Sequence, residues 1–436
     1  MLCSFAEPGK RFPTITFDNS DGKLLRCEQI RRICYCNDAR SPRASITRKN
    51  KISKEGKSLS SSNLRTLVAA CCAITVFGLA FGMTYPLLSL ILEERGVPAN
   101  IIGLNSAMMP LGILIFSPLI PKFSFHLGSK RLAIVAALMT GVCILGYKVF
   151  DNLGAWFVIR LLQGMSIATL FVLSEAWIVG SSSKEHRGKI VAIYASVLSA
   201  SFGIGPAMIG FIGTEGWLPF IIGASCIVIG VIPIGIIREV DKDPEQHNSS
   251  ILGFLPKAPM LVAAVCCFSV FDAATLALLP VYGVENGLSQ STAAFALTAL
   301  IIGNVFLQYP IGWLADVYDA RKVLTWCAVV TVLLTVTVPW IINAWLLWPV
   351  LIVAGAAGYG VYTVSLKSLG DRFSGQELVN GTAAFGAMWG FGALFGSISG
   401  GWTMTLSSRY GLPFGLTVVY LLLIAGLLLR KPAAAS

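Results

Sequence analysis

The amino-acid sequence predicts an all-α membrane protein with twelve transmembrane helices in two pseudo-symmetric six-helix bundles. Three observations support this prediction. First, 55% of the 436 residues are hydrophobic and only 13% are charged, with a mean hydropathy of +0.74, whereas soluble domains carry roughly 25% charged residues. Second, apolar runs of membrane-spanning length recur along the chain. Third, the chain repeats itself at a spacing of about 191 residues.

Residues 1–65 form a polar segment that we expect to be a disordered, basic cytoplasmic tail. The segment holds 14 Lys and Arg against 6 Asp and Glu, within a chain of net charge +11. It lacks the apolar stretch of a secretory signal. Basic residues beside membrane spans are explained by topology, so the charge does not indicate a nucleic-acid partner.

Twelve apolar runs follow this tail, and each is long enough to cross the bilayer as a helix, which takes about 20 residues. Barrel strands would be half as long and would alternate in polarity. The predicted spans are 66–92, 100–121, 130–150, 154–180, 189–213, 217–238, 258–282, 290–314, 322–343, 345–370, 381–406 and 411–430.

The distribution of Lys and Arg predicts that both termini are cytoplasmic. With the N-terminus inside and the tail excluded, fourteen basic residues fall on the cytoplasmic side and three outside, a strong positive-inside bias. The inside residues are Lys122, Lys130, Arg131, Lys184, Arg187, Lys189, Arg238, Lys242, Lys257, Arg321, Lys322, Arg372, Arg430 and Lys431; the outside residues are Arg95, Lys148 and Arg409.

The internal repeat divides the chain into two bundles, 66–238 and 258–430, joined by a cytoplasmic linker, 239–257, with a short tail at 431–436. The features that coincide are Gly96 with Gly287, GSKRL (128–132) with DARKVL (319–324), and SFGIGPAMIG (201–210) with GALFGSISGG (392–401). Two repeats with a site between them near the bilayer midplane are the architecture of secondary transporters.

Several other function classes lack their signatures. No G-x-x-x-x-G-K-[ST] phosphate loop and no H-E-x-x-H zinc motif occurs in the sequence, so neither an ATP-driven pump nor a membrane enzyme is expected. None of the eleven cysteines falls in a predicted outside loop, so no disulfide framework is implied. We expect no metal or other cofactor.

Four stretches resemble motifs of the major facilitator superfamily. They are GWLADVYDARKVL (312–324), RLLQG (160–164), EHRGK (185–189) and GIGPAMIG (203–210), the last similar to a fifth-helix motif of antiporters. The resemblance covers residues 66 to 430 and is closest to the YcaD-like bacterial branch. It implies the twelve-helix fold of that superfamily, a bacterial inner-membrane location and a monomer.

The loop between spans eight and nine resembles the conformational-lock signature of the superfamily. Gly312 is expected to permit close helix approach, and Asp316 to face a neighbouring helix N-terminus and Arg321. The second glycine of the family pattern is Asp319 here. The first-half counterpart, PKFSFHLGSKRL (121–132), has proline and phenylalanine where glycine and aspartate belong.

Four charged residues fall well inside the predicted spans: Arg160, Glu175, Asp272 and Lys367. A charge at this depth costs a few kcal/mol on insertion scales, so it usually faces a cavity or a partner. Asp272 is the most isolated carboxylate and the leading candidate for a proton carrier. Arg160 lies about 9 Å below the outer end of its helix; it either holds an anionic group of a substrate or pairs within its own half.

Glu175 and Lys367 occupy near-equivalent places in the two repeats. VLSEAW (172–177) aligns with VSLKSL (364–369) at a shift of about 192. The resemblance implies that helices four and ten close the cytoplasmic mouth of a central cavity, so the two opposite charges are expected to form a gate pair. The alternatives are a proton site at Glu175, a snorkelling Lys367 or a local structural role.

Seven uncharged polar or aromatic residues within the spans are further candidates for lining the substrate cavity. Each of them can instead hydrogen-bond one helix to another, and two of them, Asn304 and Gln308, share one helix face. The candidates are Tyr85, Asn105, Gln163, Asn304, Gln308, Tyr359 and Tyr362.

These observations predict a secondary transporter of a small organic solute, embedded in the lipid bilayer and coupled to protons by alternating access. GIGPAMIG (203–210) slightly favours export by antiport, and uptake by proton symport is the alternative direction. A non-transporting receptor or scaffold on the same fold is the alternative of another class.

Overall fold

The computed structural model describes residues 61–181, 187–236 and 251–429, and the regular structure of these residues is helical. The helices are α1 (Ser61–Glu94), α2 (Ala99–Phe116), η1 (Ser117–Leu119), α3 (Ile120–Leu127), α4 (Ser129–Val149), α5 (Leu153–Ser181), α6 (Arg187–Ile212), α7 (Leu218–Ile236), α8 (Ile251–Phe254), α9 (Pro259–Glu285), α10 (Gln290–Val317), α11 (Ala320–Ile341), α12 (Leu347–Arg372), α13 (Gly375–Leu406) and α14 (Gly411–Leu429).

The helices agree with the predicted spans, with four differences. The first helix begins at Ser61, so the last five residues of the predicted tail are helical. The second span is interrupted by η1, because the prolines at 118 and 121 each remove a backbone donor. The short helix α8 falls within the predicted linker. Finally, α13 begins six residues earlier than predicted, because its first turns have the polar sequence GQELVN (375–380), which does not read as a membrane span.

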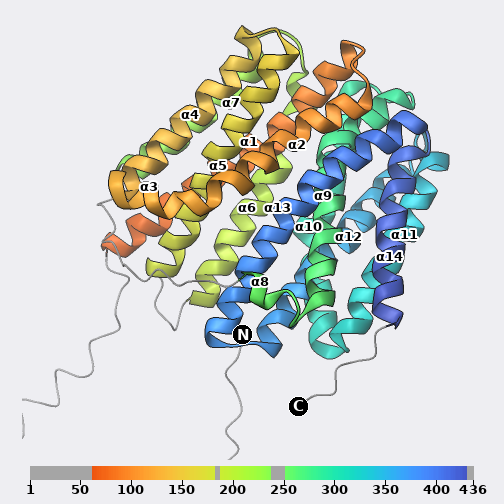
Figure 1. The fold of residues 1–436 in the computed structure, drawn as a ribbon. Coiled ribbons are helices and arrows are strands. Elements are labelled where there is room, and N and C mark those ends of the chain that lie inside the picture. Colours follow the sequence, from red (N-terminus) through yellow and green to blue (C-terminus); the bar gives the residue numbers. More distant parts are fainter. Residues whose placement is uncertain (1–60, 182–186, 237–250, 430–436) are drawn as a thin grey trace, which may run out of the picture. The chain divides into compact units, whose positions relative to one another are not determined.

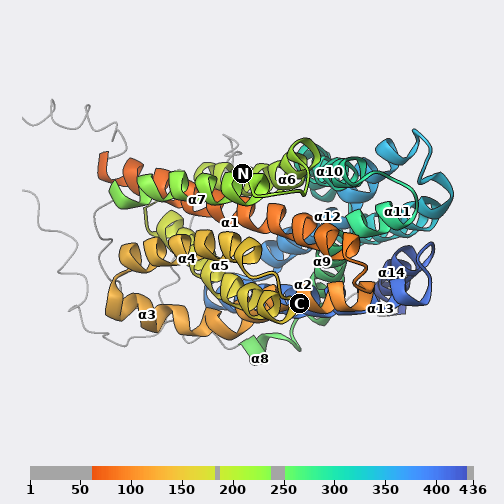
Figure 2. The same ribbon diagram turned by 90° about the horizontal axis from the view of Figure 1, so that it is seen from above.

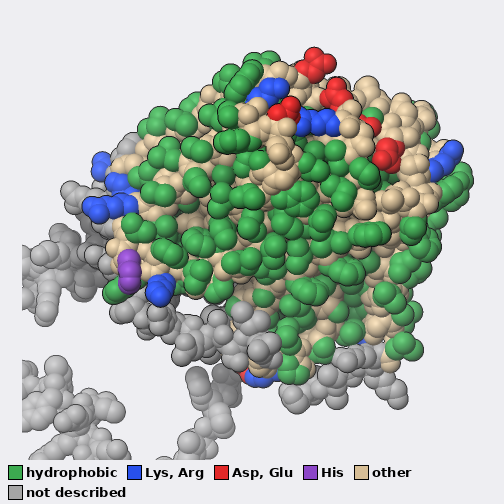
Figure 3. Space-filling model, turned by 45° about the horizontal axis from the view of Figure 1, so that its top comes forward, with side chains coloured by type: hydrophobic (Ala, Val, Ile, Leu, Met, Phe, Trp, Pro, Cys, Tyr) green, Lys and Arg blue, Asp and Glu red, His purple; other side chains and the backbone are tan. Residues whose placement is uncertain are grey.

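The surface of the helices fits a lipid environment. Eleven helices in the described ranges are long and apolar enough to cross a membrane. The twelfth long helix, α13, has 32 residues and is rich in glycine and serine, which lowers its hydropathy. Large apolar side chains such as Phe306, Trp326 and Leu422 are exposed. Figure 3 shows hydrophobic side chains over the face in view, with charged side chains at the top of the molecule and Lys and Arg also at its left edge. Exposed apolar surface of this extent calls for hydrocarbon around it.

The two predicted bundles repeat the same helix pairings (Figures 1 and 2). In the first bundle α1 packs against α6, α2 against α5, and α4 against α7; in the second, α9 packs against α13, α10 against α12, and α11 against α14. The predicted internal repeat is therefore visible in three dimensions as well as in sequence.

The 191-residue repeat extends to individual helix contacts made by glycines. A Cβ atom built on Gly112 or Gly164 would strike a backbone carbonyl of the facing helix, and the same is true 191 residues later at Gly303 and Gly355. The carbonyls they would strike belong to Leu161, Met109, Ile352 and Leu300, in the same order. Both helix pairs, α2 with α5 and α10 with α12, thus depend on equivalent close backbone approaches.

The two bundles are joined at the predicted outer end. There the Thr214 hydroxyl donates to Gln290 Oε1 at 2.7 Å, and Ser291 Oγ donates to the Gly210 carbonyl at 2.5 Å. The helix α2 packs along α13, and α1 packs against α9. Among the described residues, α5 and α12 form no extensive contact with each other. This is an arrangement closed on the predicted outer side and not joined through these two helices on the cytoplasmic side.

The contact between α2 and α13 leads to a prediction about Gly103. A Cβ atom at this position would strike the carbonyl oxygen of Ser397 and approach Gly401. Alanine favours an isolated helix over glycine by about 1 kcal/mol, so any loss in Gly103→Ala must come from wedging α2 away from α13. We expect spin labels at the outer ends of these helices to move apart and transport to fall several-fold.

A matched control for this variant is Gly235→Ala on α7, because a Cβ atom at Gly235 would meet nothing within 4 Å. If Gly103→Ala gives the same label distances and transport rate as Gly235→Ala, the α2–α13 contact does not hold the outer side closed.

The predicted orientation can be tested on two exposed residues, Glu285 at the end of α9 and Lys322 at the start of α11. A membrane-impermeant maleimide should label Glu285→Cys in intact cells and should label Lys322→Cys only after the membrane is opened. The reverse pattern would invert the topology.

Candidate functional site

Asp272, the predicted proton carrier, lies in a polar cradle built by three helices of the second bundle. The residue is on α9 and only 4% exposed. Its Oδ1 accepts a hydrogen bond of 2.7 Å from the Tyr359 hydroxyl on α12, and the side chain of Trp389 on α13 is within hydrogen-bonding reach. Ser269, one turn earlier, donates to the Trp389 carbonyl. Asp272 is therefore less isolated than predicted, although among the described residues no cation forms an ion pair with it.

Arg160 is fully buried and only partly satisfied. Its Nη1 donates to Asn105 Oδ1 at 2.8 Å, and its guanidinium carbon lies 4.9 Å from the centre of the Tyr85 ring. Both contacts lie within the first bundle, which agrees with the predicted alternative that Arg160 pairs within its own half. However, the Nε and Nη2 donors of Arg160, the Asn105 amide nitrogen and the Ser106 hydroxyl have no hydrogen-bond partner among the described residues. A buried donor without a partner is costly.

Tyr85 links the charged groups of the two halves. This residue of α1 is fully buried, and its hydroxyl donates to the Ser106 carbonyl at 3.3 Å. Its phenol lies within electrostatic range of both Arg160 and Asp272. The predicted anion-binding residue of the first half and the predicted proton-binding residue of the second therefore both act electrostatically on the same phenol.

Two of the predicted cavity residues act as bridges between helices. Gln163 Oε1 accepts from the Tyr147 hydroxyl at 2.7 Å, and its Nε2 lies 3.5 Å from Thr84 Oγ1, which connects α4, α5 and α1. Gln308 donates to the Ala356 carbonyl at 3.2 Å and accepts from Thr363 at 2.6 Å, which connects α10 to α12. Both residues therefore hydrogen-bond one helix to another, which was the alternative to lining the substrate cavity.

Among the described residues, no hydrogen bond joins either of the other two predicted cavity residues to Asp272. Asn304 is half-buried on α10. Tyr362 is also half-buried, and its ring centre lies 4.9 Å from that of Phe268.

Glu175 is accessible to water although protein surrounds most of its side chain, which is the situation of a group lining an open space. Its charge reaches Tyr194 on α6 and, across the two halves, Tyr362 on α12. Beside it, the Ser174 and Tyr194 hydroxyls share a hydrogen bond of 2.8 Å. Glu175 thus lies on the side of α5 that is turned towards α12.

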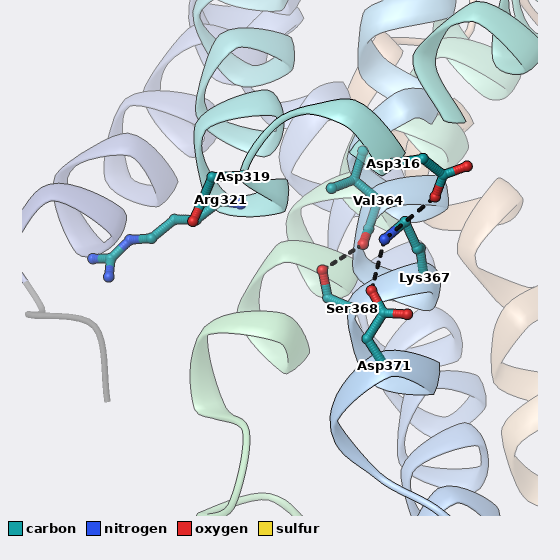
Figure 4. A network of polar contacts seen from close by, with 7 residues as sticks. All are labelled: Asp316, Asp319, Arg321, Val364, Lys367, Ser368 and Asp371. Carbon is teal, nitrogen blue, oxygen red and sulfur yellow. Dashed lines mark hydrogen bonds and ion pairs between the residues drawn. The ribbon is translucent and has the colours of Figure 1, made fainter. Parts of the chain in front are cut away.

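Lys367, the predicted partner of Glu175, is paired within its own half (Figure 4). Its Nζ lies 2.6 Å from Asp371 Oδ2, one turn along α12, and 3.4 Å from Asp316 Oδ1 at the end of α10. The predicted gate pair is therefore not formed in this arrangement of the two bundles.

The predicted conformational-lock loop is built differently from the expectation. Asp319, not Asp316, caps α11, accepting from the backbone nitrogens of Arg321 and Lys322 at 2.9 and 3.2 Å. The Arg321 guanidinium donates to the Leu427 carbonyl of α14 and points away from Asp316 (Figure 4). A Cβ atom at Gly312 would meet nothing within 4 Å. The predicted close approach at this glycine is therefore absent among the described residues.

Two voids in the structure lie apart from all these residues. One of about 220 Å³ is lined by α1, α4, α6 and α7, and one of about 380 Å³ by helices of the second bundle. None of the predicted site residues lines either void, so neither is the candidate transport site.

Two neighbours of the candidate residues were missed in the sequence. Asp371 follows Lys367 by four residues, a spacing that brings side chains together on a helix, so it could have been found. Trp389 lies 117 residues from Asp272 in the chain, and no local pattern indicates that α13 presents it to α9.

Comparisons with known proteins agree with this architecture. The family model of the Major Facilitator Superfamily matches residues 70–297 and 260–436. The chain is 25% identical over 375 residues to the uncharacterized MFS-type transporter YfkF of Bacillus subtilis (strain 168), covering 83% of this chain and 95% of that protein. It is 23% identical over 341 residues to the uncharacterized MFS-type transporter YcaD of Salmonella newport (strain SL254), covering 77% and 88%.

Solved structures share the fold at low identity. The nucleoside transporter NupG superposes with a TM-score of 0.68 at 11% identity, covering 85% of this chain and 100% of that one. A D-xylose-proton symporter gives 0.68 at 14%, covering 85% and 98%. The predictions of a transporter fold and of no enzymatic activity are confirmed, and the chain belongs to the Major Facilitator Superfamily.

Proposed function

We propose that this secondary transporter moves a small organic solute and couples its movement to protons at Asp272. The observation that carries the proposal is a buried carboxylate near the meeting of the two halves, held by the Tyr359 hydroxyl at 2.7 Å. Ionisable residues inside membrane spans usually belong to substrate paths or proton relays. Tyr85, which senses both Asp272 and Arg160, would let a change of charge in one half be felt in the other.

The alternating movement would exchange the partners of Lys367. With the bundles joined at the outer end, Lys367 pairs with Asp316 and Asp371. When the cytoplasmic side closes, α12 would meet α5, and Lys367 would gain Glu175 as a partner. Surface ion pairs contribute little individually, so such an exchange can tune the balance between states without locking either one.

Two coupling directions are proposed, in order. The GIGPAMIG sequence (203–210), on the helix that faces α1, resembles an antiporter motif and favours export of the solute against protons. The free donors of Arg160 favour the alternative, in which an anion and a proton travel together. A D-xylose-proton symporter shares this fold, which makes co-transport a natural use of it. We further propose a monomer in a bacterial inner membrane, with both termini cytoplasmic.

The test is flux in proteoliposomes. A thermal-shift screen of metabolites and drugs against purified protein supplies solutes, and each hit is measured for saturable transport with and without an imposed pH gradient. Gradient-dependent accumulation supports the proposal. Binding without any flux would favour a receptor or scaffold. Flux that does not depend on the pH gradient would exclude coupling to protons.

A further inference from the structure

The unpaired groups around Arg160 have one chemical character. Arg160 offers two free N–H donors, Nε and Nη2, and Asn105 offers its amide nitrogen. The hydroxyl of Ser106, the next residue of α2, also lacks a partner among the described residues. All three side chains are 0% exposed. Single unpaired side-chain atoms occur elsewhere in the described residues, at Ser89, Asn100 and Ser397. Arg160 and Asn105 differ because three unpaired donors belong to two side chains in contact, whereas most buried polar groups find a partner.

The free edge of Arg160 also has a definite shape. Nε and Nη2 lie on one side of the planar guanidinium, and their hydrogens point the same way. This fork matches the two oxygens of a carboxylate. Its opposite edge is occupied by Asn105 at 2.8 Å, and one face is covered by the Tyr85 ring. The side chain is therefore held in place with its bidentate edge available.

The charge of Arg160 is uncompensated as well. Removing a cation from water without an anionic partner is strongly unfavourable, and among the described residues no carboxylate forms an ion pair with this arginine. Asp272, the buried carboxylate of the other half, hydrogen-bonds Tyr359 instead. A water molecule could satisfy a donor but would leave the charge unbalanced.

From this geometry we infer that Arg160, Asn105 and Ser106 form the binding site for the carboxylate of a small organic anion, which is the transported solute. The inference rests on the proposed function and assigns its substrate class. It gives the two alternatives for Arg160 a common explanation: contacts within its own half orient the side chain, and its remaining edge binds the anion.

The position of the site indicates how the anion reaches it. Asn105 and Ser106 follow Gly103 on α2, the glycine that packs on Ser397 of α13. Arg160 lies seven residues from the predicted outer end of α5, about 10 Å at 1.5 Å per residue. The site is thus beneath the closed outer contact, and parting of α2 from α13 would open it to the predicted outer side.

The experiment compares carboxylates with their uncharged amides on the purified full-length protein. Acetate, lactate and benzoate are titrated against acetamide, lactamide and benzamide while the Tm is recorded. A carboxylate that binds should raise the Tm by several degrees at about a hundredfold excess over its Kd, and its amide should not. The response should disappear in Arg160→Gln and weaken at least about tenfold in Arg160→Lys, which keeps the charge but loses the fork.

Arg95→Gln is the control, because Arg95 is an exposed arginine that also makes a cation–π contact but has a carboxylate partner, Asp151, at 2.5 Å on the predicted outer side. Its response to carboxylates should equal that of the unmodified protein. A panel in which no carboxylate outperforms its amide, or a response that survives in Arg160→Gln, overturns the inference.

A second measurement needs no ligand. Because Arg160 carries an uncompensated charge, Arg160→Met combined with Asn105→Leu, which also removes the amide that Arg160 holds, should leave the Tm of the ligand-free protein unchanged or raised. A Tm lowered by several degrees in this double variant would show a purely structural arginine and overturn the inference. The proposed function and this inference can fail separately. If the protein accumulates a neutral solute together with protons but does not bind carboxylates, the proposed function stands and the assignment of an anionic substrate is wrong.

Discussion

Asp272→Asn is expected to abolish proton-driven accumulation while leaving exchange or downhill flux of the solute partly intact. An amide keeps the size of the side chain and can still hydrogen-bond Tyr359, but it cannot take up and release a proton. A driving force of 100 mV is worth about 2.3 kcal/mol per charge, roughly a fiftyfold accumulation ratio. The variant should bring this ratio down to about one in proteoliposomes.

The control for this variant is Asp151→Asn, which removes an exposed carboxylate that pairs with Arg95 at the predicted outer side. It should accumulate solute as the unmodified protein does. Tyr359→Phe should be intermediate, because it removes the hydrogen bond to Asp272 without removing the carboxylate. Unchanged proton-driven accumulation in Asp272→Asn would take this residue out of the mechanism.

Charge reversal at the proposed gate is expected to shift the two bundles in a predictable direction. Glu175→Lys would repel Lys367 whenever α5 and α12 approach, so it should favour the state open to the cytoplasm. A difference of about 1.4 kcal/mol in interaction energy changes the populations tenfold. Spin labels on the cytoplasmic ends of α5 and α12 report these populations as distances.

The local partners of Lys367 sharpen this experiment. Asp316→Asn and Asp371→Asn would release Lys367 from its present pairs and should shift the balance the other way, towards cytoplasmic closure. The swap of Glu175→Lys with Lys367→Glu should restore the original balance best when Asp371→Asn is also present, because Lys367→Glu alone would face two carboxylates. If Glu175→Lys leaves the distances unchanged and the swap gives nothing beyond additivity, Glu175 is not a gate residue.

The sequence predicted the helices well because a bilayer imposes length and apolarity on each span. It also predicted the repeat. Gly205 and Gly396, which the shift of 191 aligns, each pack on the backbone of the first helix of their own bundle, against Gly82 of α1 and Val270 of α9 respectively. Such contacts leave a trace in sequence since only glycine allows them.

Side-chain partners were predicted less well, because they depend on the rotation of each helix and on its neighbours. The sequence placed Asp316 beside a helix N-terminus, but the turn brings Asp319 there instead. Asp272 looked isolated because its hydrogen-bonding neighbours, Tyr359 and Trp389, come from helices that are distant in the sequence. The partners of Arg160 likewise belong to other helices, Tyr85 to α1 and Asn105 to α2, and the absence of an acceptor at its free edge among the described residues can be seen only once those helices are assembled.

The uncompensated charge of Arg160 has an electrical consequence. If an anion binds there and travels in the same direction as one proton, each cycle moves no net charge, and the membrane potential neither drives nor opposes it. If the anion leaves as a proton enters, each cycle carries two positive charges inward, and 100 mV contributes about 4.6 kcal/mol. A potassium–valinomycin potential applied to proteoliposomes at equal pH would therefore leave the first process unchanged and accelerate the second, so a current measurement alone distinguishes symport from antiport.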